Sequence, residues 1–132
     1  MKLRTSGANS SSFRRIVLLA YVATVLGATL APLSGDAYNV VSGFDKLVHV
    51  ALFGGVALLL CWNLNSVSLP TMSGVLVVTT LFAAAIEIVQ GRLWYRSGDF
   101  WDLLAGAVGA LLGVIAAWIA ARAWTQEPGT QS

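Results

Sequence analysis

The chain has 132 residues, of which 57% are hydrophobic and only 11% are charged, and its formal net charge is +2. A soluble domain is on average about 25% charged, so this composition excludes an ordinary water-soluble domain and indicates an integral membrane protein. The excess positive charge comes largely from Lys2, Arg4, Arg14 and Arg15, and no basic stripe with interleaved aromatic residues indicates nucleic-acid binding. The single cysteine, Cys61, excludes an intrachain disulfide and a cysteine-based metal site.

Four apolar runs follow one another along the chain, each with few or no charges. Crossing the hydrocarbon core takes about 20 helical residues, and long runs without alternating polarity predict helices rather than strands. The second and third runs are short, so either the bilayer is thinned around them or their helices lie at the short limit for a span. The predicted fold is all-α, a four-helix transmembrane bundle with short loops, with helices at residues 15–34, 45–64, 71–91 and 99–122.

The segments on either side of this membrane domain, which covers residues 15–122, are polar. We expect residues 1–14 and 123–132 to be disordered, because they offer little apolar surface to bury. The first apolar run could instead be a cleaved signal peptide ending near Ala28 or Ala31, but it exceeds the roughly 7–15 apolar residues of such a peptide. The basic N-terminal segment predicts a multi-pass protein with both termini in the cytoplasm.

The charged residues inside the membrane domain are distributed unevenly. Between Ile16 and Ala121 they all fall in or beside the first and third connections, and the second connection has none. Because these two connections share one side of a four-helix protein, we expect a polar cluster at one end of the bundle. The set comprises Asp36, Asp45, Lys46, Glu87, Arg92, Arg96, Asp99 and Asp102, to which His49 adds an imidazole.

Helical spacing places several of these groups on common faces. Asp45 and His49 lie four residues apart on the second predicted helix, and Glu87 and Gln90 lie three apart near the end of the third. An ionised group that faces lipid is costly, so we expect these side chains to point into the bundle. Arg96 follows the third helix, and we expect its guanidinium to contact one of the neighbouring carboxylates, because its fork of donors suits that partner.

The fourth predicted helix begins with Asp99 and Asp102, where the positive end of the helix dipole stabilises carboxylates. Gly106, Gly109 and Gly113 continue the face of Asp102 along this helix. Because glycine allows another helix to approach closely, we expect this stripe to be a packing surface.

Two polar patterns thus recur at fixed spacing inside apolar sequence. The first is Asp45-Lys46-x-x-His49-x-x-x-Phe53, and the second is Glu87-x-x-Gln90, then Arg96-x-x-Asp99-x-x-Asp102, then Gly109 and Gly113. Together they resemble the signatures of the VanZ-like family over about half of the chain. The chain departs from the family pattern at Gly106, where members often have Asn, and at Tyr95, because a Pro-Gly commonly precedes the Arg.

The resemblance implies a small protein of the bacterial cytoplasmic membrane, linked through the family's namesake to resistance against glycopeptide antibiotics of the teicoplanin type. The favoured hypothesis is a non-catalytic envelope factor that binds a membrane lipid or an amphiphilic antibiotic at the outer interface, with Lys46 and Arg96 attracting an anionic head. We expect no cofactor and no resident metal. The candidate ligand-binding residues are Asp45, Lys46, His49, Glu87, Gln90, Arg96, Asp99 and Asp102.

Three alternatives remain open. The protein could be a membrane enzyme acting on a lipid-linked phosphate, with His49 as general base oriented by Asp45, although no Gly-x-Ser-x-Gly motif or phosphate loop is present. His49, Glu87, Asp99 and Asp102 could form a cation or proton site. The charges could also be purely structural ion pairs, retained because breaking a buried pair leaves an uncompensated charge. Arg92 lies outside the matched pattern, and we expect it to be solvated.

Overall fold

The computed structural model describes residues 8–32, 44–96 and 98–125, and this part of the chain is helical apart from short connections. Each helix is long and apolar enough to cross a membrane, so the predicted four-helix architecture is confirmed. The expected disorder of residues 1–7 and 126–132, and the position of Asp36, lie outside the described residues. The helices are α1 (Ala8–Leu30), α2 (Phe44–Leu64), α3 (Leu69–Gln90) and α4 (Phe100–Thr125).

Helix α1 begins at Ala8, inside the segment that the sequence predicted to be disordered up to residue 14. Contacts with the end of α2 account for the difference. The Arg14 guanidinium donates to the carbonyl of Trp62 at 3.1 Å, and the Asn63 amide donates to the carbonyl of Arg14 at 3.0 Å. Phe13 also meets the Trp62 ring edge-on, with 6.5 Å between ring centroids. These tertiary contacts stabilise helical turns that local composition alone did not favour.

The connection between α2 and α3 is short and is defined by its cap residues. Asn65 adopts a positive φ of 53° directly after α2, a conformation that Asn tolerates better than most residues. Ser68 caps α3, because its hydroxyl accepts a hydrogen bond from the backbone N–H of Thr71, and Pro70 occupies the first turn. Helix α3 therefore begins at Leu69, slightly before the predicted residue 71.

Helices α2 and α4 approach each other along a seam of glycines. A Cβ built on Gly109 would collide with the backbone carbonyl of Val50, and one built on Gly113 would collide with the carbonyl of Gly54. The reverse contact is also close, since a Cβ on Gly54 would lie 3.1 Å from the carbonyl oxygen of Gly109. The small residues thus bring two backbones into direct contact, as in other closely packed membrane helices.

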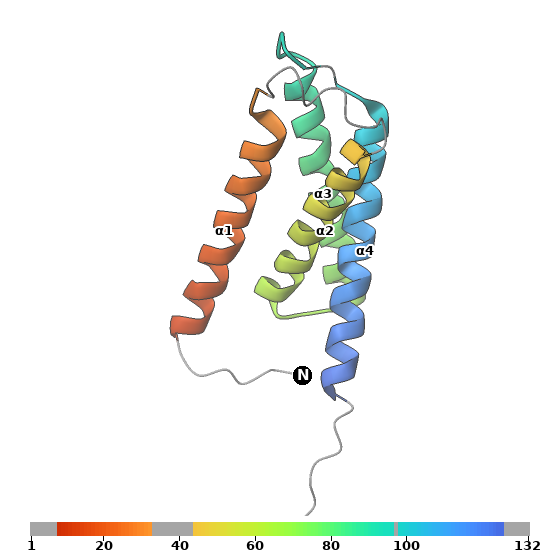
Figure 1. The fold of residues 1–132 in the computed structure, drawn as a ribbon. Helices are drawn as coiled ribbons and strands as arrows, with labels where there is room; N and C mark the ends of the chain where they lie inside the picture. Colours follow the sequence, from red (N-terminus) through yellow and green to blue (C-terminus); the bar gives the residue numbers. More distant parts are fainter. Residues whose placement is uncertain (1–7, 33–43, 97, 126–132) are drawn as a thin grey trace, which may run out of the picture.

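Helix α1 lies to the side of the group formed by α2, α3 and α4 (Figure 1). Its middle contacts α2 where the Tyr21 ring fills the space left open by Gly55, and the Tyr21 hydroxyl donates to the carbonyl of Ala51 at 3.4 Å. Val25 of α1 is fully buried in one core cluster with Phe53. The site described next therefore rests mainly on α2, α3 and α4.

Candidate functional site

The polar residues gather at the end of the bundle where α1 and α3 finish and α2 and α4 begin (Figure 1). We call this the polar end. The structure brings residues from α2, α3 and the start of α4 together there, and their side chains divide by exposure. The inner group is His49, Glu87 and Asp102, which are buried, and the outer pair is Lys46 and Asp99, which remain partly accessible.

The inner group centres on the imidazole of His49, whose side chain is only 3% exposed. Its Nε2 atom lies 3.3 Å from Oε1 of Glu87, and its Nδ1 atom lies 3.1 Å from the backbone carbonyl oxygen of Asp45. The Phe53 ring stacks on the imidazole, with 5.8 Å between ring centroids and 29° between planes. The expected alignment of His49 by Asp45 thus comes mainly from the backbone of Asp45, since its carboxylate is 4.0 Å away.

The outer pair connects α2 with the start of α4. The Lys46 ammonium lies 3.1 Å from Oδ2 of Asp99 and 3.3 Å from Oδ1 of Asp102, and it donates a hydrogen bond to each carboxylate. Lys46 and Asp99 have side chains that are 37% and 41% exposed. One lysine therefore bridges the accessible and the buried parts of the cluster.

Asp99 also organises the backbone at the start of α4. Its carboxylate accepts a hydrogen bond from the N–H of Trp101 at 2.9 Å, as an N-cap residue does, and its own N–H donates to Oε2 of Glu87 at 3.0 Å. The backbone N–H of Trp101, followed by the Lys46 ammonium, lowers the pKa of Asp99 below its ordinary value, because both favour the charged form. The Asp99 carboxylate thus holds Lys46, and the backbone N–H of Asp99 holds Glu87.

A second set of contacts closes the C-terminal end of α1. Its last carbonyl groups lack partners within the helix, and residues from α3 and the following loop supply them. The amide of Gln90 donates to the carbonyl of Thr29 at 2.6 Å, the guanidinium of Arg96 donates to the same carbonyl, and the Tyr95 hydroxyl donates to the carbonyl of Leu30 at 2.8 Å. A cation at this position also faces the negative end of the helix dipole.

The expected contact between Arg96 and a carboxylate is therefore wrong for the described part of the chain, where Lys46 holds that position instead. Thr29, Leu30 and Tyr95 were not predicted as partners, because two of the three contribute only backbone carbonyls. The last carbonyl groups of any helix need hydrogen-bond donors from outside it. The polar residues after α3 were the feature of the sequence that could have predicted such donors for α1.

Comparison with known proteins supports the resemblance seen in the polar patterns. The family model described as VanZ/LLP1 matches residues 3–121, which includes α1, α2, α3, all but the last turn of α4, and every member of the polar end. The chain belongs to the VanZ/LLP1 family. No curated protein and no solved structure gave a match.

The packing explains one departure of the chain from the family pattern. A Cβ at Gly106 would lie 3.0 Å from the Cβ of Ala83 and 3.1 Å from Cδ2 of Phe53. An Asn side chain at this position would therefore need both neighbours to move. Here the Phe53 ring packs beside Gly106 and stacks on His49, so the space at this position is already filled without an amide.

Aromatic side chains surround the polar end on the outside. Trp94, in the loop between α3 and α4, is 94% exposed, and Trp101 in the first turn of α4 is also exposed. Exposed tryptophan is typical of the boundary between membrane and water. Arg92 is exposed in the same loop, as the sequence analysis expected.

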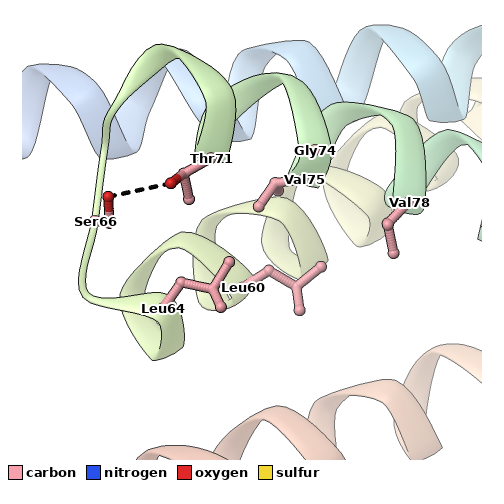
Figure 2. A pocket seen from close by; sticks show the side chains of 7 residues that line it. All are labelled: Leu60, Leu64, Ser66, Thr71, Gly74, Val75 and Val78. Carbon is pink, nitrogen blue, oxygen red and sulfur yellow. Dashed lines mark hydrogen bonds between the residues drawn. The ribbon is translucent and has the colours of Figure 1, made fainter.

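The opposite end of the bundle differs in chemistry. Figure 2 shows a pocket of about 330 Å³ between α2 and α3, lined mainly by apolar side chains such as Leu60, Leu64 and Val78. Its polar groups are the hydroxyls of Ser66 and Thr71, which lie 3.1 Å apart and satisfy each other. This pocket shares no residue with the polar end.

Proposed function

We propose that this VanZ/LLP1-family protein is a non-catalytic factor of the bacterial envelope that binds an amphiphile at the polar end. Its expected biological effect is a changed susceptibility to lipophilic glycopeptides of the teicoplanin type. The polar end faces outward in this proposal, and both termini are cytoplasmic. The observation that carries the proposal is the exposed part of the cluster, because the partly accessible Lys46 and Asp99 share one end of the bundle with the exposed Trp94 and Trp101.

The charges at the polar end favour a head group with both signs of charge. The sequence analysis expected Lys46 and Arg96 to attract an anionic head. Lys46 is instead neutralised by Asp99 and Asp102, and Arg96 is directed to the end of α1. A head that carries an ammonium and a carboxylate could exchange partners with the Lys46–Asp99 pair without leaving a charge unpaired. The tryptophan rings would border the apolar tail.

The burial of the imidazole favours binding over catalysis. A general base must reach the proton that it removes, directly or through one water. His49 is nearly inaccessible, and its two nitrogens face Glu87 and the carbonyl of Asp45. The enzyme hypothesis, in which His49 acts on a lipid-linked phosphate, therefore requires the inner group to open.

A deletion strain tests the proposal when it is complemented with wild type, Lys46→Gln, Asp99→Asn or the control Arg92→Gln. We expect the deletion to change teicoplanin susceptibility, and wild type and Arg92→Gln to restore it. Lys46→Gln and Asp99→Asn should fail to restore it even when the protein level in the membrane is normal. In nanodiscs, purified wild type and Arg92→Gln should bind a fluorescent teicoplanin-type ligand more tightly than Lys46→Gln and Asp99→Asn.

The enzyme alternative predicts a different pattern. His49→Gln would abolish turnover of a lipid-linked phosphate by purified protein while sparing ligand binding. If deletion leaves every susceptibility unchanged and turnover depends on His49, the binding proposal is wrong and the enzyme hypothesis replaces it.

A further inference from the structure

The inner group contains two buried polar atoms that the chain leaves unsatisfied. Nε2 of His49 and Oε1 of Glu87 have no hydrogen-bond partner among the described residues, and both are inaccessible to solvent. They lie 3.3 Å apart, but not in hydrogen-bonding geometry. A buried polar group without a partner is costly and rare, so this pair needs an explanation.

The hydrogen bond on the other side of the ring decides what His49 offers. Its Nδ1 atom contacts the carbonyl oxygen of Asp45, which can only accept, so Nδ1 carries the hydrogen. In the neutral imidazole, Nε2 then presents a lone pair toward an oxygen of Glu87. Two electron-rich atoms in contact are stabilised by a positive species between them, either a proton or a metal ion. A histidine that donates its Nδ1–H to a backbone carbonyl is also typical of a metal ligand.

Two further carboxylates lie near the imidazole. Asp45, His49 and Asp102 each offer a ligand atom, and these atoms lie within 4.8 Å of one another. Ligands bound to one ion at about 2.1 Å lie at most about 4.2 Å apart, so a small contraction closes the shell. Asp45 and Asp102 would supply oxygen and His49 would supply nitrogen, and Glu87, whose Oε1 lies 3.3 Å from Nε2, borders this group of three.

The charge of the polar end also favours a cation. The polar end holds the carboxylates of Asp45, Glu87, Asp99 and Asp102. Among the described residues, the Lys46 ammonium pairs with two of them, Asp99 and Oδ1 of Asp102. A carboxylate has two oxygens and can serve two cations. Lys46 therefore leaves negative charge at the inner group uncompensated.

From these contacts we propose that the inner group, together with Asp45, is a binding site for a divalent transition-metal ion such as Zn²⁺ or Mn²⁺. One imidazole with several carboxylates suits these ions better than the all-oxygen shells of Mg²⁺ or Ca²⁺. The ion joins α2, α3 and α4 at the polar end. This proposal departs from the expectation, based on sequence, that the protein has no resident metal. The site adjoins the outer pair through Asp102, which Lys46 contacts, and its Asp45 ligand is exposed, whereas His49 is buried.

The test uses full-length protein in detergent, purified with a tag that contains no histidine and carrying Cys61→Ala to remove the one thiol. After dialysis against a chelator, Zn²⁺ and Mn²⁺ are titrated calorimetrically and bound metal is measured by elemental analysis. We expect about one ion per chain, as for a single site that folding preforms. His49→Gln, Glu87→Gln and Asp102→Asn should each weaken binding at least about 10-fold, and Arg92→Gln should not.

A measurement on the Cys61→Ala protein without further substitutions keeps the test decisive if those variants fail to fold. Saturating Zn²⁺ should raise the midpoint of thermal unfolding, because an ion that binds only the folded chain stabilises it, and Mg²⁺ at the same concentration should not. Absence of bound metal, or no shift of the midpoint with Zn²⁺ or Mn²⁺, would overturn the site. So would full affinity in folded His49→Gln protein. Teicoplanin susceptibility enters none of these outcomes, so the amphiphile proposal can fail separately.

Discussion

The attachment of α4 to α2 differs from the attachment of α1 to the same helix. Between α2 and α4, glycines bring the two backbones together along a seam at Gly54, Gly109 and Gly113. Helix α1 instead contacts its neighbours through separate side chains, such as Tyr21 in its middle, and through the carbonyl groups at its end. A backbone seam tolerates no added atom, whereas side-chain contacts can be lost one at a time.

This difference separates the parts of the polar end. The inner group is held by α2, α3 and α4, so its geometry depends on the glycine seam. Helix α1 contributes no side chain to the inner group, and its end is bound by the same α3 residue, Gln90, that lies one helical turn from Glu87. We therefore expect changes at the seam to affect the whole protein and changes at the end of α1 to remain local.

The largest effect should follow from Gly109→Leu. The new side chain would start at a Cβ that already collides with the carbonyl of Val50, so α2 and α4 must separate. Overpacking a core typically costs about 1–3 kcal/mol, and a clash with backbone belongs at the top of that range or above it. Thermal unfolding in detergent measures the loss.

The matched control is Gly27→Leu in α1, because a Cβ at Gly27 meets nothing within 4 Å. We expect this variant to unfold near the wild-type temperature. Equal destabilisation by both variants would contradict the distinction between the seam and α1.

An intermediate effect should follow from Lys46→Met. The substitution keeps the length of the side chain but removes the cation that neutralises Asp102, which is buried. Breaking a buried pair leaves its other member uncompensated, whereas an exposed pair contributes little, so we expect this partly exposed lysine to cost less stability than Gly109→Leu and more than Arg96→Met. The free energy of unfolding in a denaturant series provides the measurement.

The double variant Lys46→Met with Asp102→Asn sharpens this prediction. The double variant removes both the lysine cation and the buried carboxylate that it neutralises, so no charge is left unpaired. Its loss of unfolding free energy should therefore be smaller than the sum of the losses in the two single variants. Simple additivity would show that the two side chains do not depend on each other.

The smallest effect should follow from Arg96→Met at the end of α1. The carbonyl of Thr29 keeps the hydrogen bond from Gln90, so we expect a loss of about 1 kcal/mol or less. Hydrogen exchange should increase at the C-terminal turn of α1 and stay unchanged along α2 and α4. Arg92→Met provides the control, and exchange that rises throughout the bundle would contradict a local role for Arg96.

Composition and spacing predicted the fold and the family correctly, because long apolar runs and polar residues at helical intervals are local properties of the sequence. The pairing of charges was harder to predict. Lys46 and Arg96 both had carboxylates within reach, and the choice depended on where α1 ends. The last carbonyl groups of a helix need hydrogen-bond donors, and here they belong to Thr29 and Leu30. Because these residues are uncharged, a search of the sequence for charge partners does not find them.

The start of α1 shows a similar limit. Serine-rich sequence is a poor predictor of helix, yet Phe13 and Arg14 contact Trp62 across the bundle and extend the helix to Ala8. Contacts between residues far apart in the sequence decided this boundary, as they decided the partner of Arg96. Polar spacing predicted which residues lie at the polar end, and only the packed helices defined which of them are buried.

The uncharged connection at residues 65–68 has a consequence for how the chain enters a bilayer. Topology is set largely by lysine and arginine in the short segments that flank each span, and this connection contains neither. The α2–α3 hairpin therefore carries no retention signal at its tip, and translocating that tip requires no charge to cross the hydrocarbon. Its two helices can be inserted as a pair in either direction during synthesis, so the decision on sidedness belongs to the rest of the chain.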